Sequence, residues 1–135
     1  MHVFIPSRCQ VPVSVVVLAA HLVFILYLLD MSFLPDVVGR FELGRVVISS
    51  GVYAATLERS PLGPFVRYCL ERHVLGDWGI CHSDDEVHND AAVSGGDSIC
   101  SVYHVPEGVY RHQSLILVVT EADRSCTTVL FESEF

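Results

Sequence analysis

The sequence contains no lysine, so arginine supplies all eight of its permanently positive side chains. Against these stand 16 aspartates and glutamates, which give a net charge of −8 at neutral pH. Residues 1–40 are balanced in charge, and the acidic excess falls entirely within residues 41–135. An acidic surface repels the phosphate backbone. Binding to nucleic acid without regard to its sequence is therefore disfavoured.

Cysteine is present, but never in the spacing of a zinc knuckle or a thiol redox pair. No two of the five cysteines are separated by two residues. Cys69, Cys100 and Cys126 fall at apolar positions of predicted elements, where a reduced thiol behaves as a small apolar side chain. We therefore expect reduced, buried thiols. Two disulfides among the four later cysteines are the alternative if this part of the chain is exported.

Charged residues are missing altogether from the apolar run at residues 11–29. As a helix these 19 residues would span roughly 28 Å, close to the ~30 Å hydrocarbon core of a bilayer. The sequence therefore predicts a single transmembrane helix and a membrane location, with the N-terminus inside because Arg8 precedes the run and Asp30 follows it. The alternatives are a signal sequence and a translation start at Met31 or at another internal codon. In the latter case the protein would be cytoplasmic.

Changes in composition divide the chain into an apolar segment at 1–30, a linker at 31–43 and an acidic domain at 44–135. Hydrophobic period and turn residues predict three helices and three strands in the domain. The helices are expected at 51–59, 63–76 and 83–94, and the strands at 99–105, 113–120 and 126–131, with a strand or helix lead-in at 45–49. Helices followed by a meander indicate the α+β class. We expect short helices packed on a three- or four-stranded antiparallel sheet, preceded by an apolar N-terminal helix.

Seven potential metal ligands lie within ten residues at the start of the third predicted helix. They are Cys81, His82, Asp84, Asp85, Glu86, His88 and Asp90. Such side chains could bind zinc or another divalent ion. We favour a solvated helix start instead, because Ser83 and Glu86 have the spacing of a capping box and acidic residues suit the helix dipole. No metal site and no cofactor are predicted.

Asp77 and Trp78 stand between two glycines at the end of the second predicted helix. We favour a tight turn in which Asp77 accepts hydrogen bonds from backbone N–H groups and Trp78 fills the core. The alternative is a binding surface that these two residues form around the indole. His73, in the last turn of the helix, is expected to be stabilised as a cation by the helix dipole.

Glu121, Asp123 and Arg124 occupy the predicted turn between the last two strands. One interpretation makes Glu121 or Asp123 a general base and Arg124 an anion clamp, assisted by His104 or Thr127. The other is an Asx-type turn with a local ion pair. The sequence holds no complete catalytic or cofactor motif.

Four short motifs follow one another in order: GRVV at 44–47, RHVLGDWG at 72–79, SVYH at 101–104 and TEADRSCTTVL at 120–130. In these motifs residues 44–135 resemble a family of small, uncharacterised bacterial proteins that are described as plasmid-related. The resemblance implies a soluble intracellular domain and supplies no catalytic residue. Residues 1–43 have no counterpart in that family, and Cys81 and His82 depart from its pattern.

Two functions follow from these observations. The first is a non-enzymatic accessory or interaction protein of a bacterial mobile element, which binds an unknown protein partner and is tethered to a membrane through residues 11–29. The second is a small hydrolase or nuclease-like enzyme that uses Glu121, Asp123 and Arg124. An enzyme needs these side chains to converge in a concave pocket, whereas an interaction protein can leave them on a convex turn.

Overall fold

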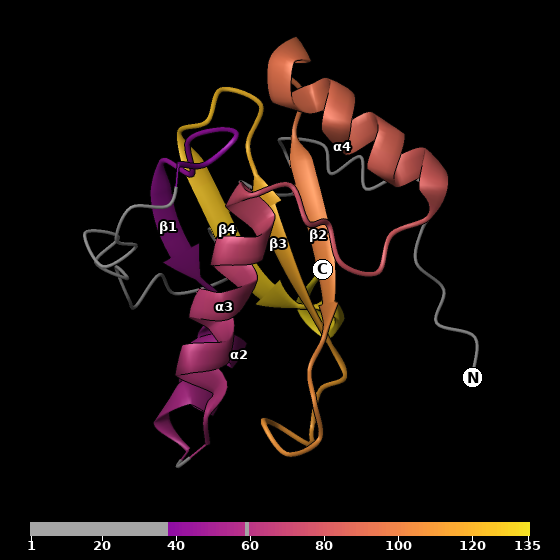
Figure 1. The fold of residues 1–135 in the computed structure, drawn as a ribbon. Coiled ribbons are helices and arrows are strands. Elements are labelled where there is room, and N and C mark those ends of the chain that lie inside the picture. Colours follow the sequence, from indigo (N-terminus) through magenta and orange to yellow (C-terminus); the bar gives the residue numbers. More distant parts are fainter. Residues whose placement is uncertain (1–37, 59) are drawn as a thin grey trace.

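A computed structural model describes residues 38–58 and 60–135, in which three α-helices and four β-strands form an α+β domain (Figure 1). The chain runs through β1 (Arg45–Ile48), α2 (Ser50–Leu57), α3 (Leu62–Val74) and α4 (Ser83–Gly95). It continues through β2 (Ile99–His104), β3 (Leu115–Thr120) and β4 (Cys126–Phe131), and a short 3-10 turn, η2 (Glu132–Glu134), follows. The α+β class predicted from the order of helices and strands is confirmed.

The four strands lie in the order β1-β4-β3-β2, and the sheet is mixed. β2, β3 and β4 pair antiparallel as the expected meander, with Val118 of β3 opposite Val129 of β4. β1 pairs parallel to β4, with Val46 opposite Thr127. The prediction of an entirely antiparallel sheet was therefore wrong. The three helices that separate β1 from the meander form a long crossover, and such a connection permits the parallel direction.

The helices begin and end close to the predicted residues. Ser49 caps α2 by accepting a hydrogen bond from the backbone N–H of Val52 at 3.1 Å. Gly96 ends α4 in the left-handed conformation, with φ of 79°, which glycine adopts without steric cost. The predicted capping box of α4 was wrong, because Ser83 is the first helical residue and the N-cap, His82, makes no side-chain hydrogen bond to the helix.

The main core lies between one face of the sheet and the two helices α2 and α3, which cross in front of it in Figure 1. Strand residues alternate between the two faces of a sheet, so every second side chain points toward these helices. The core comprises Val46, Ile48, Val52, Leu62, Val66, Cys69, Leu70, Tyr103, Ile116, Val118, Val129 and Phe131, among others. A smaller cluster of Trp78, Ala92 and Ile99 joins α4 to the start of β2.

Part of the predicted linker belongs to the domain. Leu43 is 6% exposed in the main core, and Phe41 packs against the same core. The predicted transmembrane segment at 11–29 and the rest of the linker before Val38 lie outside the described residues. Among the helices of residues 38–58 and 60–135, none is both long and apolar enough to cross a membrane.

None of the four cysteines in the described ranges, Cys69, Cys81, Cys100 and Cys126, forms a disulfide. Cys69 and Cys100 are buried, whereas Cys81 and Cys126 are partly exposed. Burial raises the pKa of the Cys69 thiol to about 12, which keeps it protonated at neutral pH. The expected burial is found for Cys69 and Cys100 but not for Cys126, and the reduced state of the thiols stays a prediction.

Candidate functional site

The turn between β3 and β4 holds its polar side chains in local hydrogen bonds. Asp123 accepts a hydrogen bond from the backbone N–H of Ser125 at 2.9 Å, as in an Asx-type turn. The carboxylate of Glu121 accepts one from the Ser125 hydroxyl at 3.0 Å. Hydrogen bonding to Ser125 lowers the pKa of Asp123, so this carboxylate is ionised and a weak base near neutral pH.

Arg124 ties this turn to the end of α4. Its guanidinium donates to the carbonyl of Ala92 at 2.5 Å, to that of Asp97 at 2.7 Å and to that of Glu121 at 3.0 Å. Its backbone has a φ of 62°, the left-handed conformation that is uncommon outside glycine. Because three of its five N–H donors bind these carbonyls, Arg124 holds the turn against the end of the helix.

His104 lies away from this turn. It is the last residue of β2 and pairs with Leu115, whereas the β3–β4 turn lies beside Ile99, the first residue of β2. At about 3.4 Å per residue, roughly 17 Å of strand separates the two positions. The structure thus brings Glu121, Asp123 and Arg124 together, and it places His104 at the opposite end of the sheet.

Asp77 and Trp78 form the turn after α3. Asp77 makes a paired contact with Arg72, with Oδ2 2.7 Å and Oδ1 3.0 Å from guanidinium nitrogens, and this contact lowers the pKa of Asp77. Asp77 also accepts a hydrogen bond from the backbone N–H of Gly79 at 3.2 Å. Trp78 is only 5% exposed. The tight turn and the core position of the indole are therefore confirmed, while a binding role for Asp77 and Trp78 stays a prediction.

His73, Phe41 and Trp78 pack ring against ring behind this turn. The His73 and Phe41 centroids are 5.2 Å apart in an edge-to-face contact, and Phe41 stacks on Trp78 at 6.1 Å. Arg124 lies 5.6 Å above the Phe41 ring, close enough for a cation–π contact. The cluster joins the chain before β1, the end of α3 and the β3–β4 turn.

A buried chain of hydrogen bonds runs through His73. Its Nδ1 lies 2.5 Å from the Ser101 hydroxyl, and its Nε2 lies 2.8 Å from the Thr120 hydroxyl. Thr120 is 2.7 Å from the Thr127 hydroxyl, which donates to the carbonyl of Leu43 at 2.6 Å. All four side chains are completely buried. This series of hydrogen bonds therefore links α3 to β2, β3, β4 and the segment before β1.

The Leu43 carbonyl at the end of this series of hydrogen bonds determines which group donates in each bond as far as His73 Nε2. Because Leu43 O can only accept, Thr127 donates to it and accepts from Thr120, which in turn accepts from His73 Nε2–H. Since the ring is neutral, Nδ1 accepts from Ser101. Burial, together with the charge of Arg124, lowers the pKa of His73 from 6.5 to about 3. The prediction of a cationic His73 was wrong, because desolvation outweighs the helix dipole.

The acidic start of α4 is less solvated than predicted. Asp85 is 2% exposed, and Asn89, one turn later, is 1% exposed. Asn89 exchanges two hydrogen bonds with the backbone of Cys100, at 2.7 and 3.2 Å, and so extends the edge of β2. Within residues 38–58 and 60–135, Oδ2 of Asp85 and Nε2 of His88 have no hydrogen-bond partner. No three potential ligands are grouped closely enough there to hold a metal ion.

A groove of about 510 Å³ lies between α2 and α3, and the sequence interpretation did not anticipate it. It is lined by Ile48, Tyr53, Thr56, Leu57, Gly63, Pro64, Val66 and Arg67. Leu57 is 68% exposed at its mouth, whereas Ile48 and Val66 are buried at its base. The sequence carried one signal of this site: α2 contains no charged residue, although part of its surface faces solvent.

Comparisons of the chain with protein-family models, curated proteins and solved structures gave no match.

Proposed function

We propose that this protein is a non-enzymatic accessory protein that binds another polypeptide through the groove between α2 and α3. The proposal agrees with the resemblance of residues 44–135 to plasmid-related proteins of bacterial mobile elements. The acidic charge of the chain disfavours nucleic acid as the partner, because like charges repel.

The groove is the observation that carries the proposal. Its volume of about 510 Å³ lies in the range of ~300–1,000 Å³ that is usual for pockets that bind a ligand group. The apolar base and the polar Thr56 and Arg67 match the anatomy of a protein interface, in which an apolar centre is surrounded by polar residues. A partner would insert one or two large apolar side chains between the helices, in the manner of helix-in-groove recognition.

The outer surface of α2 supports the same conclusion. Ala54 and Leu57 are exposed, and no residue within α2 carries a charge. Depletion of charge at the centre of a patch is a compositional mark of interfaces. A solvated helix of this acidic domain would be expected to present charged side chains instead.

A small hydrolase or nuclease-like enzyme that uses the β3–β4 turn is the weaker alternative. Glu121, Asp123 and Arg124 are engaged in hydrogen bonds within the turn or to α4. None of them lines the groove, and neither does His104. The groove therefore does not contain the side chains proposed to perform the chemistry.

The test is affinity purification of the tagged full chain from its native host, followed by mass spectrometry of the retained proteins. We expect the wild type to retain a defined partner and Leu57→Asp to lose it, because the substitution puts a charge at the mouth of the groove. Val87→Asp is the matched control, since Val87 is 69% exposed on α4. This control should retain the partner.

Two results would contradict the proposal. The wild type could retain no partner above the level of an unrelated acidic protein, or Leu57→Asp could retain the same partner in the same yield. Circular dichroism of each variant at matched concentration verifies that lost binding does not reflect lost folding.

A further inference from the structure

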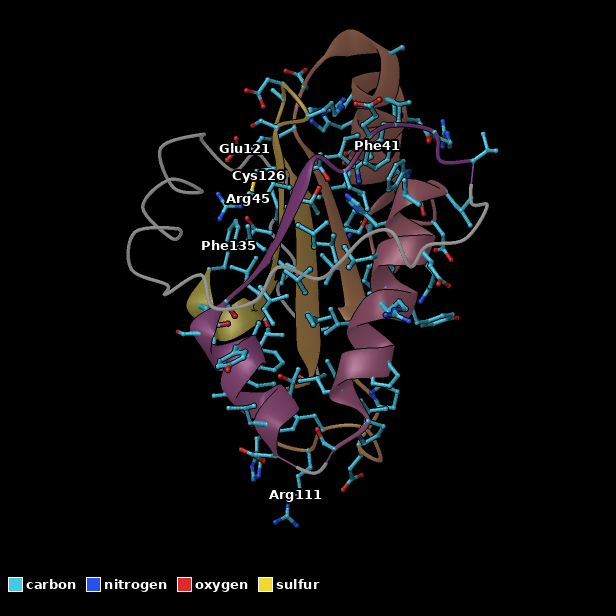
Figure 2. All side chains as sticks on the ribbon, turned by 90° about the vertical axis from the view of Figure 1, so that its left-hand side faces the viewer. Phe41, Arg45, Arg111, Glu121, Cys126 and Phe135 are labelled. Atoms are coloured by element: carbon cyan, nitrogen blue, oxygen red, sulfur yellow. The ribbon has the colours of Figure 1, made fainter. Side chains whose placement is uncertain are left out.

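The groove between α2 and α3 differs in charge from the chain as a whole. The two helices supply most of its lining, and Figure 2 shows them converging toward the connection between them. Among the described residues that line the groove, Arg67 is the one charged side chain. Glu58 and Glu71, the carboxylates closest to these residues in sequence, are not part of that lining. The groove is therefore locally cationic in a chain whose net charge is −8.

Arg67 is exposed on α3, where a bound segment can reach its guanidinium. A guanidinium presents its N–H donors in a planar fork that matches a carboxylate, and the two groups form parallel hydrogen bonds. Its five N–H donors allow this contact while the side chain keeps other partners. An arginine beside an apolar groove therefore favours a ligand in which a carboxylate lies close to an apolar side chain.

We propose that the segment bound in the groove carries an aspartate or glutamate about one helical turn from its apolar anchor, and that this carboxylate binds Arg67. This inference rests on the proposed function, since it specifies the chemistry of the polypeptide that occupies the same groove. The spacing follows from helix-in-groove recognition, because residues three or four apart lie on the same face of a helix.

The net charge of the chain does not prevent such a segment from binding. At physiological ionic strength the Debye length is about 8 Å, and exposed charges farther apart are largely screened from one another. The attraction of a carboxylate in direct contact with Arg67 is screened much less. A lysine or arginine at the same position would instead meet Arg67 as a like charge. Arg67 therefore selects against basic residues beside the anchor.

Gly63 provides a way to block the groove without a clash inside the domain. It lines the groove in the first turn of α3, and a Cβ added there meets nothing within 4 Å. Gly63→Leu should therefore place its side chain in the open space of the groove. Gly95, the last residue of α4, also has nothing within 4 Å of an added Cβ and does not line the groove. Gly95→Leu is thus the matched control.

Selection from a phage-displayed library of random peptides on the purified full chain tests the proposal. Peptides that bind the wild type and Gly95→Leu but not Gly63→Leu are retained as groove ligands. Leu57→Asp, at the mouth of the groove, repeats this selection with an independent substitution. We expect the groove ligands to share a large apolar residue with an aspartate or glutamate three or four positions away.

Fluorescence anisotropy with one selected peptide then isolates the contact with Arg67 in a double-mutant cycle. Replacement of the peptide carboxylate by the corresponding amide should weaken binding to the wild type about tenfold, as expected when a hydrogen bond between charged groups is lost. Arg67→Gln should bind the acidic and the amide peptide alike. Arg45→Gln, which removes an exposed arginine outside the groove lining, should keep the tenfold preference.

The possible failures of the inference and of the proposed function are distinguishable. Groove ligands without an acidic residue at this spacing, or equal affinities of the acidic and amide peptides for the wild type, would overturn the inference alone. Absence of any peptide that Gly63→Leu and Leu57→Asp exclude would overturn the proposed function and the inference with it. Circular dichroism at matched concentration verifies that each variant is folded.

Discussion

Thr127 donates a hydrogen bond from its hydroxyl to the backbone carbonyl of Leu43 at 2.6 Å, across 84 residues of sequence. This bond links the chain before β1 to β4, and it sets the direction of every donor back to His73. Ser101, His73, Thr120 and Thr127 are thus joined in one series of hydrogen bonds. The loss of a single hydroxyl leaves both neighbours unpaired.

Thr127→Val should destabilise the domain. The substitution keeps the shape of the side chain but leaves the Leu43 carbonyl and the Thr120 hydroxyl without their partner. A buried polar group that loses its partner costs about 1–3 kcal/mol, and we expect a decrease in the free energy of unfolding of this size. Thr128→Val is the matched control, since Thr128 is 7% exposed on the opposite face and its hydroxyl makes a 4.0 Å contact with the Cys126 sulfur. Urea denaturation of both variants measures the difference, and equal losses would refute the role assigned to Thr127.

The buried His73 should make stability dependent on pH. Its pKa is about 3 in the folded protein and 6.5 as the ordinary value, so below pH 6.5 the unfolded chain binds a proton that the folded chain does not. Stability is fully present above pH 6.5 and decreases as the pH falls toward 3, by up to ~1.4 kcal/mol per pH unit. His73→Gln keeps one donor and one acceptor but cannot titrate, so its dependence should be flatter.

Urea denaturation at a series of pH values, followed by Trp78 fluorescence, measures this effect. His112→Gln, which removes an exposed histidine, serves as the control and should follow the wild type. If His73→Gln and the wild type have the same slope between about pH 4.5 and 6.5, the neutral form assigned to His73 is wrong.

Arg124→Ala should loosen the end of α4 and the β3–β4 turn together. The variant loses hydrogen bonds to three carbonyls, and we expect a decrease of about 1–3 kcal/mol in the free energy of unfolding. Arg111→Ala removes an arginine that points into solvent in Figure 2 and should be close to neutral. Hydrogen exchange locates the effect: faster exchange in Arg124→Ala should be confined to the residues around Ala92 and the turn. Faster hydrogen exchange throughout the domain would argue against a local role of Arg124 in joining α4 to the turn.

Gly79→Ala should be among the most damaging single substitutions in this domain. Gly79 has a φ of 73°, and an added Cβ would lie 2.0 Å from the carbonyl oxygen of Val102. The same approach supports hydrogen bonds from Ile80 N to Val102 O and from Val102 N to Trp78 O. We expect a loss of more than about 3 kcal/mol, since both strain and lost hydrogen bonds contribute. Gly95→Ala, where the new Cβ meets nothing within 4 Å, is the control and should stabilise slightly. Thermal denaturation compares the two, and similar melting temperatures would contradict the close approach.

The helices and the meander could be predicted because their signals are local. Strand β4 has the predicted bounds, and Gly96 ends α4 through a conformation that favours glycine. The direction of β1 could not be predicted in this way, because a strand of one arginine and three apolar residues carries no information about which strand it joins. Parallel pairing with β4 depends on how the three helices between β1 and β2 direct the chain back to the sheet.

The candidate site was harder to predict because burial of its side chains outweighs the effects that can be read from neighbouring residues in the sequence. His73 follows Cys69 by four residues, so its position on the apolar side of α3 was visible in the sequence, yet the helix dipole suggested a cation. Asp85 lies one turn before Asn89 on the buried side of α4, and polar residues at both positions conceal the apolar period. The groove between α2 and α3 depends on how two helices pack, which composition alone does not define.

The parallel pairing of β1 with β4 also has a consequence for folding kinetics. The meander of β2, β3 and β4 forms from neighbours in sequence, whereas β1 must close a loop of about 80 residues before it gains its first contact with β4. The entropy cost of that closure is met only when most of the meander already exists as a template. We therefore expect an order of assembly in which β1, which precedes the other described strands in the sequence, joins the sheet last.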